Sequence, residues 1–323
     1  MAGGATSTVH RRKVTIGAAI AITHRNTFSM SQARVWLITG ANSGIGLRLA
    51  LHALSNGDKV IAAARNVSKL PASLAQATAL ALDPGSSRRD IKTAVASALS
   101  IHPRIDVLVN MAGYGLSSPV EYLDENELKD QFNVNVFGPI SIIQEILPTM
   151  RAQKSGHILN VSSIAGFAGS PPFGAYNASK AALDAFTETL DREVEPFGIR
   201  ALSIVPGYFP TNFLSTALAT YKQERVGEYT LPQQGYGAFE KYHQAHMDQG
   251  QIGDATKAAA RIYEIVVLGP GKGAKREWVR VPLGPDCASR MKAKITVLRE
   301  SVDAYEPIWS STDVEKERLQ EFA

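Results

Sequence analysis

From residue 34 onward, short apolar runs alternate with longer amphipathic stretches. A strand buried on both faces is apolar along its whole length, so this alternation is typical of a parallel sheet covered by helices on both faces. Each intervening stretch is long enough for a crossover helix. We therefore predict an α/β fold with a doubly wound parallel sheet of about seven strands. The expected strands are residues 35–39, 59–64, 79–82, 105–110, 157–162, 200–205 and 278–281, and the expected helices are residues 45–55, 87–100, 124–153, 175–195, 255–268 and 288–304.

The chain has 323 residues, of which 45% are hydrophobic, enough to fill the core of one such domain over residues 34–323. Cys287 is the single cysteine, which excludes an intrachain disulfide and a cysteine-cluster metal site. A reducing, cytoplasmic setting is the expectation from this cysteine usage, and no metal is expected.

Residues 1–33 form a basic leader, since no acidic residue precedes Asp58. Their composition favours a disordered leader; a mitochondrial targeting peptide is the alternative with weaker support, and Met30 is an alternative start. The apolar piece at residues 16–22 is too short to span a bilayer, and we expect no membrane span. Because the basic excess lies in this leader, no nucleic-acid partner is indicated.

Residues 206–253 interrupt the alternation. They contain no clear strand and many aromatic side chains, and they follow the sixth expected strand, at the edge where such sheets bind ligands. We expect a substrate lid over a medium or large apolar molecule. Packing of the aromatics in the core or in an oligomer contact is the alternative. The remainder, residues 286–323, is expected to be a helical C-terminal extension, which lies over the pocket or forms a dimer contact.

The segment TGANSGIG, residues 39–46, lies between the first expected strand and the first expected helix. Gly40 suits a tight turn, Gly44 suits close approach of the backbone to a pyrophosphate, and Gly46 suits close packing of the helix on the strand. The helix would direct its free N–H groups at the phosphates. The spacing differs from the common G-x-G-x-x-G fingerprint, so a purely structural turn is an alternative for this segment taken alone.

Two further features concern the cofactor and the chemistry. Where an NAD-binding protein usually has an acidic residue after the second strand, this chain has Ala64 and Arg65. A guanidinium can grip the 2′-phosphate of NADP(H), so this cofactor is favoured over NAD(H), with a solvated arginine as the alternative. Tyr176 and Lys180 share one face of an expected helix, where the ammonium would lower the pKa of the phenol toward neutrality.

Taken together, these motifs and their order resemble the short-chain dehydrogenases/reductases over residues 34–281. The resemblance implies a Rossmann fold of the single-domain branch that uses NADP(H), with a small-molecule carbonyl or alcohol as substrate. A homodimer and a homotetramer are both compatible with it. By position in the family pattern, the catalytic residues are Asn135, Ser163, Tyr176 and Lys180, and the cofactor-binding residues are Gly40, Asn42, Ser43, Gly44, Ile45, Gly46, Arg65, Asp83, Asn110, Ala112, Gly113, Tyr176, Lys180, Pro206, Gly207 and Thr211.

The resemblance also assigns a role to each residue group. Tyr176 would exchange the proton and Ser163 would hydrogen-bond the same substrate oxygen. Lys180 would hold the nicotinamide ribose, and Asn135 would support a water that connects the lysine to solvent, or hydrogen-bond at a helix kink. Met111 replaces the second asparagine of the family's Asn-Asn-Ala-Gly turn, where its side chain is not the reactive one. The expected function is ketone or alcohol oxidoreduction. Dehydratase or epimerase chemistry is a second enzyme hypothesis, and a catalytically silent NADP(H)-binding sensor or scaffold is the hypothesis from another class.

Overall fold

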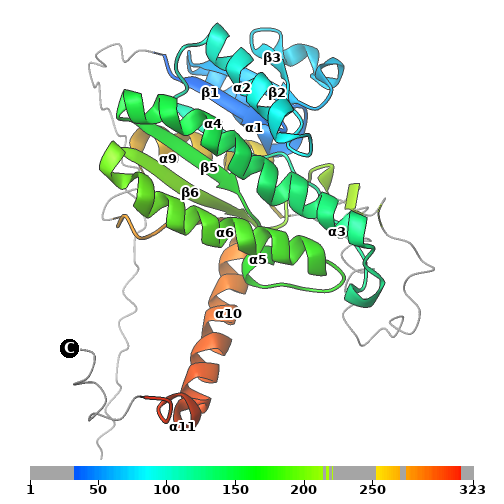
Figure 1. Ribbon diagram of the computed structural model, residues 1–323, viewed down its shortest axis with the longest axis vertical. Helices are drawn as coiled ribbons and strands as arrows, with labels where there is room; N and C mark the ends of the chain where they lie inside the picture. The colour runs from blue at the N-terminus through cyan, green and yellow to red at the C-terminus, as the bar shows by residue number, and fades with distance from the viewer. Residues whose placement is uncertain (1–32, 214–215, 218–219, 221–251, 270–273, 314–323) are drawn as a thin grey trace, which may run out of the picture. The chain divides into compact units, whose positions relative to one another are not determined.

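A seven-stranded, fully parallel sheet in the order β3-β2-β1-β4-β5-β6-β7 organises the protein (Figure 1). The computed structural model describes residues 33–213, 216–217, 220, 252–269 and 274–313. The predicted fold class is confirmed, and every expected strand is present with its ends shifted by at most two residues. The strands are β1 (Val35–Thr39), β2 (Lys59–Ala64), β3 (Thr78–Ala81), β4 (Val107–Asn110), β5 (Gly156–Val161), β6 (Ile199–Pro206) and β7 (Arg280–Leu283).

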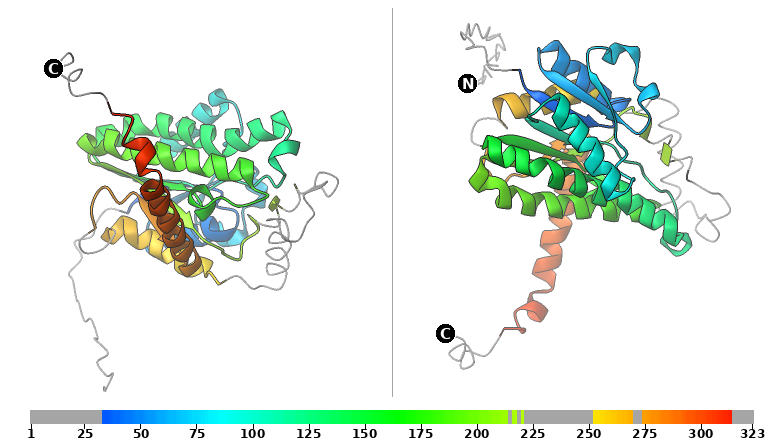
Figure 2. Two further views of the ribbon diagram at one scale, coloured as in Figure 1. Left: turned by 90° about the horizontal axis from the view of Figure 1, so that it is seen from below. Right: turned by 45° about the horizontal axis from the view of Figure 1, so that its top comes forward.

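Helices cover both faces of this sheet. In Figure 1, α2, α4 and α6 lie in front of the strands and α9 lies behind them, and the left view of Figure 2 shows the sheet between these two helical layers. The helices are α1 (Gly44–Ser55), α2 (Arg88–Ile101), α3 (Glu125–Phe132), α4 (Gly138–Gln153), α5 (Ile164–Phe167), α6 (Gly174–Val194), α9 (Ala255–Leu268), α10 (Pro285–Ala304) and α11 (Glu306–Trp309).

The alternation of side chains along β1 divides the core into two. Trp36 and Ile38 pack with α1 and α9 in one apolar cluster, whereas Val35 and Leu37 pack with α2, α4 and α6 in the other. Successive side chains of a strand point to opposite faces, and all five residues of β1 are buried. This explains why the strand reads as one continuous apolar run.

The expected helix over residues 124–153 is interrupted in its middle. A π-helical turn, Asn133–Phe137, separates α3 from α4. Pro139 lies at the start of α4 and has no N–H to donate to the preceding turn, so the regular helical ladder cannot run through this point. The irregular turn carries Asn135, whose side chain is 1% exposed.

The order of the strands reverses between β1 and β4, because β1 pairs with both β2 and β4. In an open α/β sheet, ligands bind outside the carboxyl ends of the strands at such a reversal. A ligand site is therefore expected at the segments after β1 and β4.

None of the helices in the described part of the chain combines the length and the apolar composition that a membrane span requires.

Several expectations fall on segments that are not described. The leader of residues 1–33 lies outside the described residues except for Ala33, and so does most of the predicted lid of residues 206–253. The C-terminal extension is helical as far as Trp309, because α10 and α11 follow β7, and residues 314–323 are outside the described part.

Candidate functional site

The glycine-rich segment joins β1 to α1. Gly40 and Gly44 have positive φ values of 68° and 56°, which side chains rarely adopt. A Cβ on Gly46 would lie 2.5 Å from the carbonyl oxygen of Gly40, so the helix packs on the turn as the sequence predicts. The first turn of α1 carries no acidic side chain, which leaves its positive end uncompensated there. Asn42, Ser43 and Ile45 complete the turn, with Ser43 at the position before α1.

Thr39 ties this segment to the turn after β4. Its hydroxyl accepts hydrogen bonds from the backbone N–H groups of Met111 (3.0 Å) and Ala112 (3.1 Å). A Cβ on Gly40 would meet the backbone of Ala112 at 3.0 Å. The glycine segment and the Asn110–Gly113 turn are thus in direct contact. Thr39 was not among the predicted site residues, although it is the first residue of the segment TGANSGIG.

Asn110 lies at the end of β4 and is 2% exposed. Its Nδ2 donates to Asn160 at 2.9 Å, while its Oδ1 is a buried acceptor without a partner among the described residues. Gly113 is packed closely, because a Cβ there would lie 3.0 Å from Asn135 Oδ1 and 3.5 Å from Lys180 Nζ. The turn therefore connects the glycine segment to the predicted catalytic residues.

The segment after β6 also contacts the glycine-rich segment. Gly207 N–H donates to Leu283 O at 2.9 Å, and Tyr208 N–H donates to Asp286 at 2.8 Å. A Cβ on Gly44 would meet the Thr211 methyl group at 3.2 Å, so Thr211 lies beside the glycine segment. The structure thus places Thr211 next to the predicted cofactor loop, with Pro206 ending β6 and Gly207 following it.

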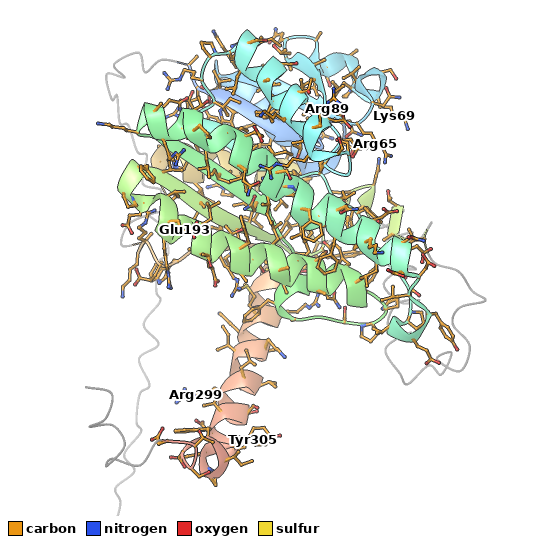
Figure 3. The ribbon with its side chains drawn as sticks, viewed as in Figure 1. Arg65, Lys69, Arg89, Glu193, Arg299 and Tyr305 are labelled. Carbon is orange, nitrogen blue, oxygen red and sulfur yellow. The ribbon has the colours of Figure 1, made fainter. Side chains whose placement is uncertain are left out.

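Arg65 and Asp83 lie further out. Arg65 is exposed and directly follows β2, and Asp83 follows β3, where its Oδ1 accepts from Gly85 N–H at 2.9 Å. Figure 3 shows Arg65 on the same side of the molecule as Lys69 and Arg89. This corner carries three basic side chains near the carboxyl ends of the strands.

Tyr176 and Lys180 occupy successive turns of α6, 7% and 5% exposed respectively. Ser163, the N-cap of α5, hydrogen-bonds the phenol of Tyr176. Lys180 Nζ donates to Val161 O at 2.7 Å and lies 5.8 Å from the centroid of the tyrosine ring. The structure brings together these three residues as predicted.

Asn135 reaches the same cluster through its amide. Its Nδ2 donates to Tyr114 O at 3.0 Å and to Ser179 Oγ at 3.1 Å, and its Oδ1 accepts from Tyr114 N–H at 3.2 Å. The side chain therefore joins the π-helical turn to the Asn110–Gly113 segment and to α6. These contacts agree with a hydrogen-bonding residue at a helix kink.

The expected lowering of the tyrosine pKa is wrong for this structure. Burial raises the pKa of Tyr176 to about 12, and this effect outweighs the hydrogen bond from Ser163 that opposes it. Burial also lowers the pKa of Lys180 to about 8, against the attraction of Asp184. At neutral pH the phenol is therefore protonated and the amine is charged.

Sequence reasoning missed Asp184, one turn beyond Lys180 on α6. It is fully buried, accepts a hydrogen bond from the Ser203 hydroxyl and has Arg280 Nε at 3.7 Å from its Oδ2. Burial raises the pKa of this carboxyl, which Ser203, Ser162, Arg280 and Lys180 lower in part. The sequence did contain a signal for Asp184, because Tyr176, Lys180 and Asp184 follow one another at intervals of four residues on one helical face.

Comparison with known proteins agrees with this arrangement. Residues 34–222 match the family model described as short chain dehydrogenase. Among curated proteins, oxidoreductase BOA17 of Botryotinia fuckeliana is 32% identical over 273 residues, which cover 83% of this chain and 95% of that protein. Oxidoreductase claN of Passalora fulva is 45% identical over 190 residues, covering 56% of this chain and 84% of that one. A crystal structure of a short-chain dehydrogenase from Streptomyces avermitilis is 35% identical with a TM-score of 0.77, and covers 88% of this chain and 100% of its own.

Proposed function

This chain belongs to the short-chain dehydrogenase family, and on that premise we propose that it is an NADP(H)-dependent oxidoreductase acting on a carbonyl or secondary alcohol of an apolar molecule. The observation that carries the proposal is the convergence of Ser163, Tyr176 and Lys180 around one buried phenol. NADP(H), when bound, supplies or accepts the hydride.

The residues present fit a dinucleotide. The segment from Gly40 to Gly46 has the positive φ values and the side-chain-free surface that let a backbone approach a pyrophosphate. The uncompensated start of α1 favours an anion. We call this segment, Gly40 to Gly46, the cradle. The Oδ1 of Asn110, a buried acceptor without a partner among the described residues, lies in the neighbouring turn after β4. We assign the pyrophosphate to the cradle and the rest of the cofactor to the residues that follow β2, β3, β4 and β6.

Arg65 favours NADP(H) over NAD(H). It follows β2, the strand next to β1, and the preceding residue is alanine rather than an acidic residue. A guanidinium forms paired, charge-assisted hydrogen bonds with a phosphate, and Lys69 and Arg89 add positive charge on the same side (Figure 3).

The protonation states support the reducing direction. With a pKa of about 12, the Tyr176 hydroxyl keeps its proton at neutral pH and can donate it to the oxygen of a carbonyl group as hydride reaches the carbon. Ser163, which hydrogen-bonds the same phenol, would donate to that oxygen as well. One such preorganised donor contributes on the order of 3 kcal/mol to transition-state stabilisation. We assign Lys180 to the nicotinamide ribose and Asn135 to holding Tyr114 and Ser179, while its water-supporting role stays a prediction.

An apolar substrate is supported by one ring contact. Phe213, in the described part of the predicted lid, lies 5.1 Å from the ring of Tyr176, measured between centroids. An aromatic surface beside the proton donor suits an apolar carbonyl compound of medium or large size.

Replacing Tyr176 by phenylalanine tests the catalytic assignment. We expect Tyr176→Phe to bind NADPH as the wild type does and to lose at least a thousandfold in kcat, because the hydroxyl is the proton donor. Tyr122→Phe, at an exposed tyrosine, is the control and should keep its activity. NADPH oxidation is followed across ketones, aldehydes and quinones. Activity retained in Tyr176→Phe refutes the role, and NADPH binding without turnover of any compound by the wild type would favour the silent sensor.

Replacing Arg65 by alanine tests the cofactor assignment separately. We expect Arg65→Ala to weaken NADPH binding at least tenfold and to leave NADH binding nearly unchanged, because only NADPH carries the 2′-phosphate. Calorimetric titration with both cofactors measures this. Arg192→Ala, which removes an exposed arginine on α6, controls for net charge. Equal losses for both cofactors would show that the phosphate is bound elsewhere.

A further inference from the structure

Within the part of the chain that the structure describes, helix α10 packs on the domain through its first half. Cys287 is fully buried, and its Sγ donates to Val205 O at 3.1 Å. Met291, one turn later, packs against the cluster of Ile164, Val205 and Cys287. From Ile295 to the end of α11, every residue is exposed. Arg299 and Tyr305, labelled in Figure 3, lie on this second part.

This exposed part carries a narrow apolar stripe. Ile295, Leu298, Val302 and Tyr305 are between 45% and 59% exposed. Their spacings of three, four and three residues place them within a sector of about 80°, which is the a/d pattern of a helix that pairs with one other helix. A helix that packs on a globular core or lies on a membrane presents a wider apolar face. The stripe therefore fits a single helical partner.

At its far end the stripe is extended by α11. Ile308 and Trp309 are 63% and 51% exposed, and the indole Nε1 of Trp309 donates to Val302 O at 2.9 Å. Six apolar side chains that are each roughly half exposed offer on the order of 500 Å² to a partner, compared with about 800 Å² per partner in a standard interface. This area is sufficient for an association of moderate strength.

The charges along α10 and α11 indicate which partner the stripe binds and in which direction the two helices run. The first half of α10 carries Arg290, Lys292 and Lys294, and the region from its second half into α11 carries Glu300, Asp303 and Glu306. None of the six forms an ion pair with another described residue. Two copies of the helix laid antiparallel would place each basic half beside an acidic half, whereas a parallel pair would align like charges. Arg299 is the one basic residue near the centre.

We propose that α10 docks antiparallel against α10 of a second copy of this chain, with the stripe of Ile295, Leu298, Val302 and Tyr305 as the seam. The two-fold axis then passes near residue 300. In this register Leu298 faces Val302 of the second copy and Ile295 faces Tyr305 of the second copy. Lys292 falls near Glu306 of the second copy, so each dimer gains two such ion pairs.

The first test compares the self-association of the full chain with that of stripe variants. Sedimentation velocity between about 1 and 100 µM should show a concentration-dependent association step in the wild type. Leu298→Asp combined with Val302→Asp should weaken this step at least tenfold, because the seam then carries charge. Val297→Asp is the matched control, since Val297 is 55% exposed on the same helix but lies outside the stripe. Circular dichroism confirms that each variant is folded.

The second test concerns direction. Lys292→Glu alone and Glu306→Lys alone should each weaken association several-fold, and the double variant should restore it, because the pair is re-formed with opposite polarity. In a parallel pair the double variant would gain nothing over the single ones. The proposal is overturned if the stripe variant associates like the wild type, or if the wild type stays monomeric and its helix instead binds vesicles of anionic lipid.

Discussion

Replacing Lys180 by methionine should make the protein more stable while it abolishes turnover. Lys180 is 5% exposed, and burial lowers its pKa from 10.5 to about 8. Keeping the ammonium charged in the folded state therefore costs about 3 kcal/mol relative to the unfolded state. That value already includes the attraction of Asp184. Lys180→Met also loses the hydrogen bond from Nζ to Val161 O, which costs about 1 kcal/mol. Its unfolding free energy should therefore exceed that of the wild type by about 2 kcal/mol at neutral pH.

The pH dependence of this gain has a definite sign. Between pH 8 and 10.5 the unfolded state binds more protons than the folded state at this position, so wild-type stability rises with pH across that window. The advantage of Lys180→Met should therefore be complete below about pH 8 and shrink as the pH approaches 10. Above pH 10 the raised pKa values of Tyr176 and Tyr263, each about 12, lower the stability of both proteins equally.

Urea unfolding of the cofactor-free protein, followed by far-ultraviolet circular dichroism at several pH values, measures the difference in unfolding free energy. Lys180→Arg is the control, because arginine stays charged across the range and should show no gain. The reasoning is refuted if Lys180→Met is less stable than the wild type near pH 7, or if its advantage is the same near pH 7 and pH 10.

Two further predictions concern the cradle and α6. Gly46→Ala should weaken NADPH binding more than tenfold and lower the unfolding free energy by about 1–3 kcal/mol, because the new Cβ would lie 2.5 Å from the Gly40 carbonyl oxygen. Calorimetry measures the binding and urea unfolding measures the stability. Unchanged values for both would contradict the close packing of α1 on the turn. Asp184→Asn should move the alkaline limb of the reduction rate to lower pH, because Asp184 raises the pKa of Tyr176. A pH–rate profile tests this shift, with Asp191→Asn, also buried on α6, as the variant that should change stability without moving the limb.

The sheet was predictable because burial on both faces leaves a simple trace in the sequence. All residues of β1 are buried, so the strand appears as an unbroken apolar run. Strand ends moved by up to two residues. At Asp106, just before β4, the backbone N–H donates to Val35 O at 2.9 Å and the carboxylate accepts from Val35 N–H at 2.8 Å. Such side-chain bonds to a neighbouring strand depend on three-dimensional contacts and leave no periodic signal.

The candidate site, like the sheet, was predictable from the sequence only in part. The order of Asn135, Ser163, Tyr176 and Lys180 could be matched to a family pattern from sequence alone. The direction of the tyrosine pKa shift could not, because it depends on how completely the phenol is removed from water. A helix kink at Asn135 was one of the two hypotheses for that residue, but the π-helical turn itself was not predicted, since the apolar periodicity continues through it.

The hydroxyl of Thr39 has a consequence for how the cofactor can enter and leave. It binds the backbone of Met111 and Ala112 and donates to Val109 O at 3.3 Å, so the turns after β1 and β4 are joined into a single wall. Neither turn can open without breaking these bonds to the other. The segment after β6 contacts this part of the protein through the Thr211 methyl group beside Gly44, through Phe213 beside Gly115 and through Thr220, whose hydroxyl accepts from Ser117 N–H at 2.9 Å. The turns after β1 and β4 would therefore form one rigid side of the site, which keeps its shape while a cofactor is exchanged.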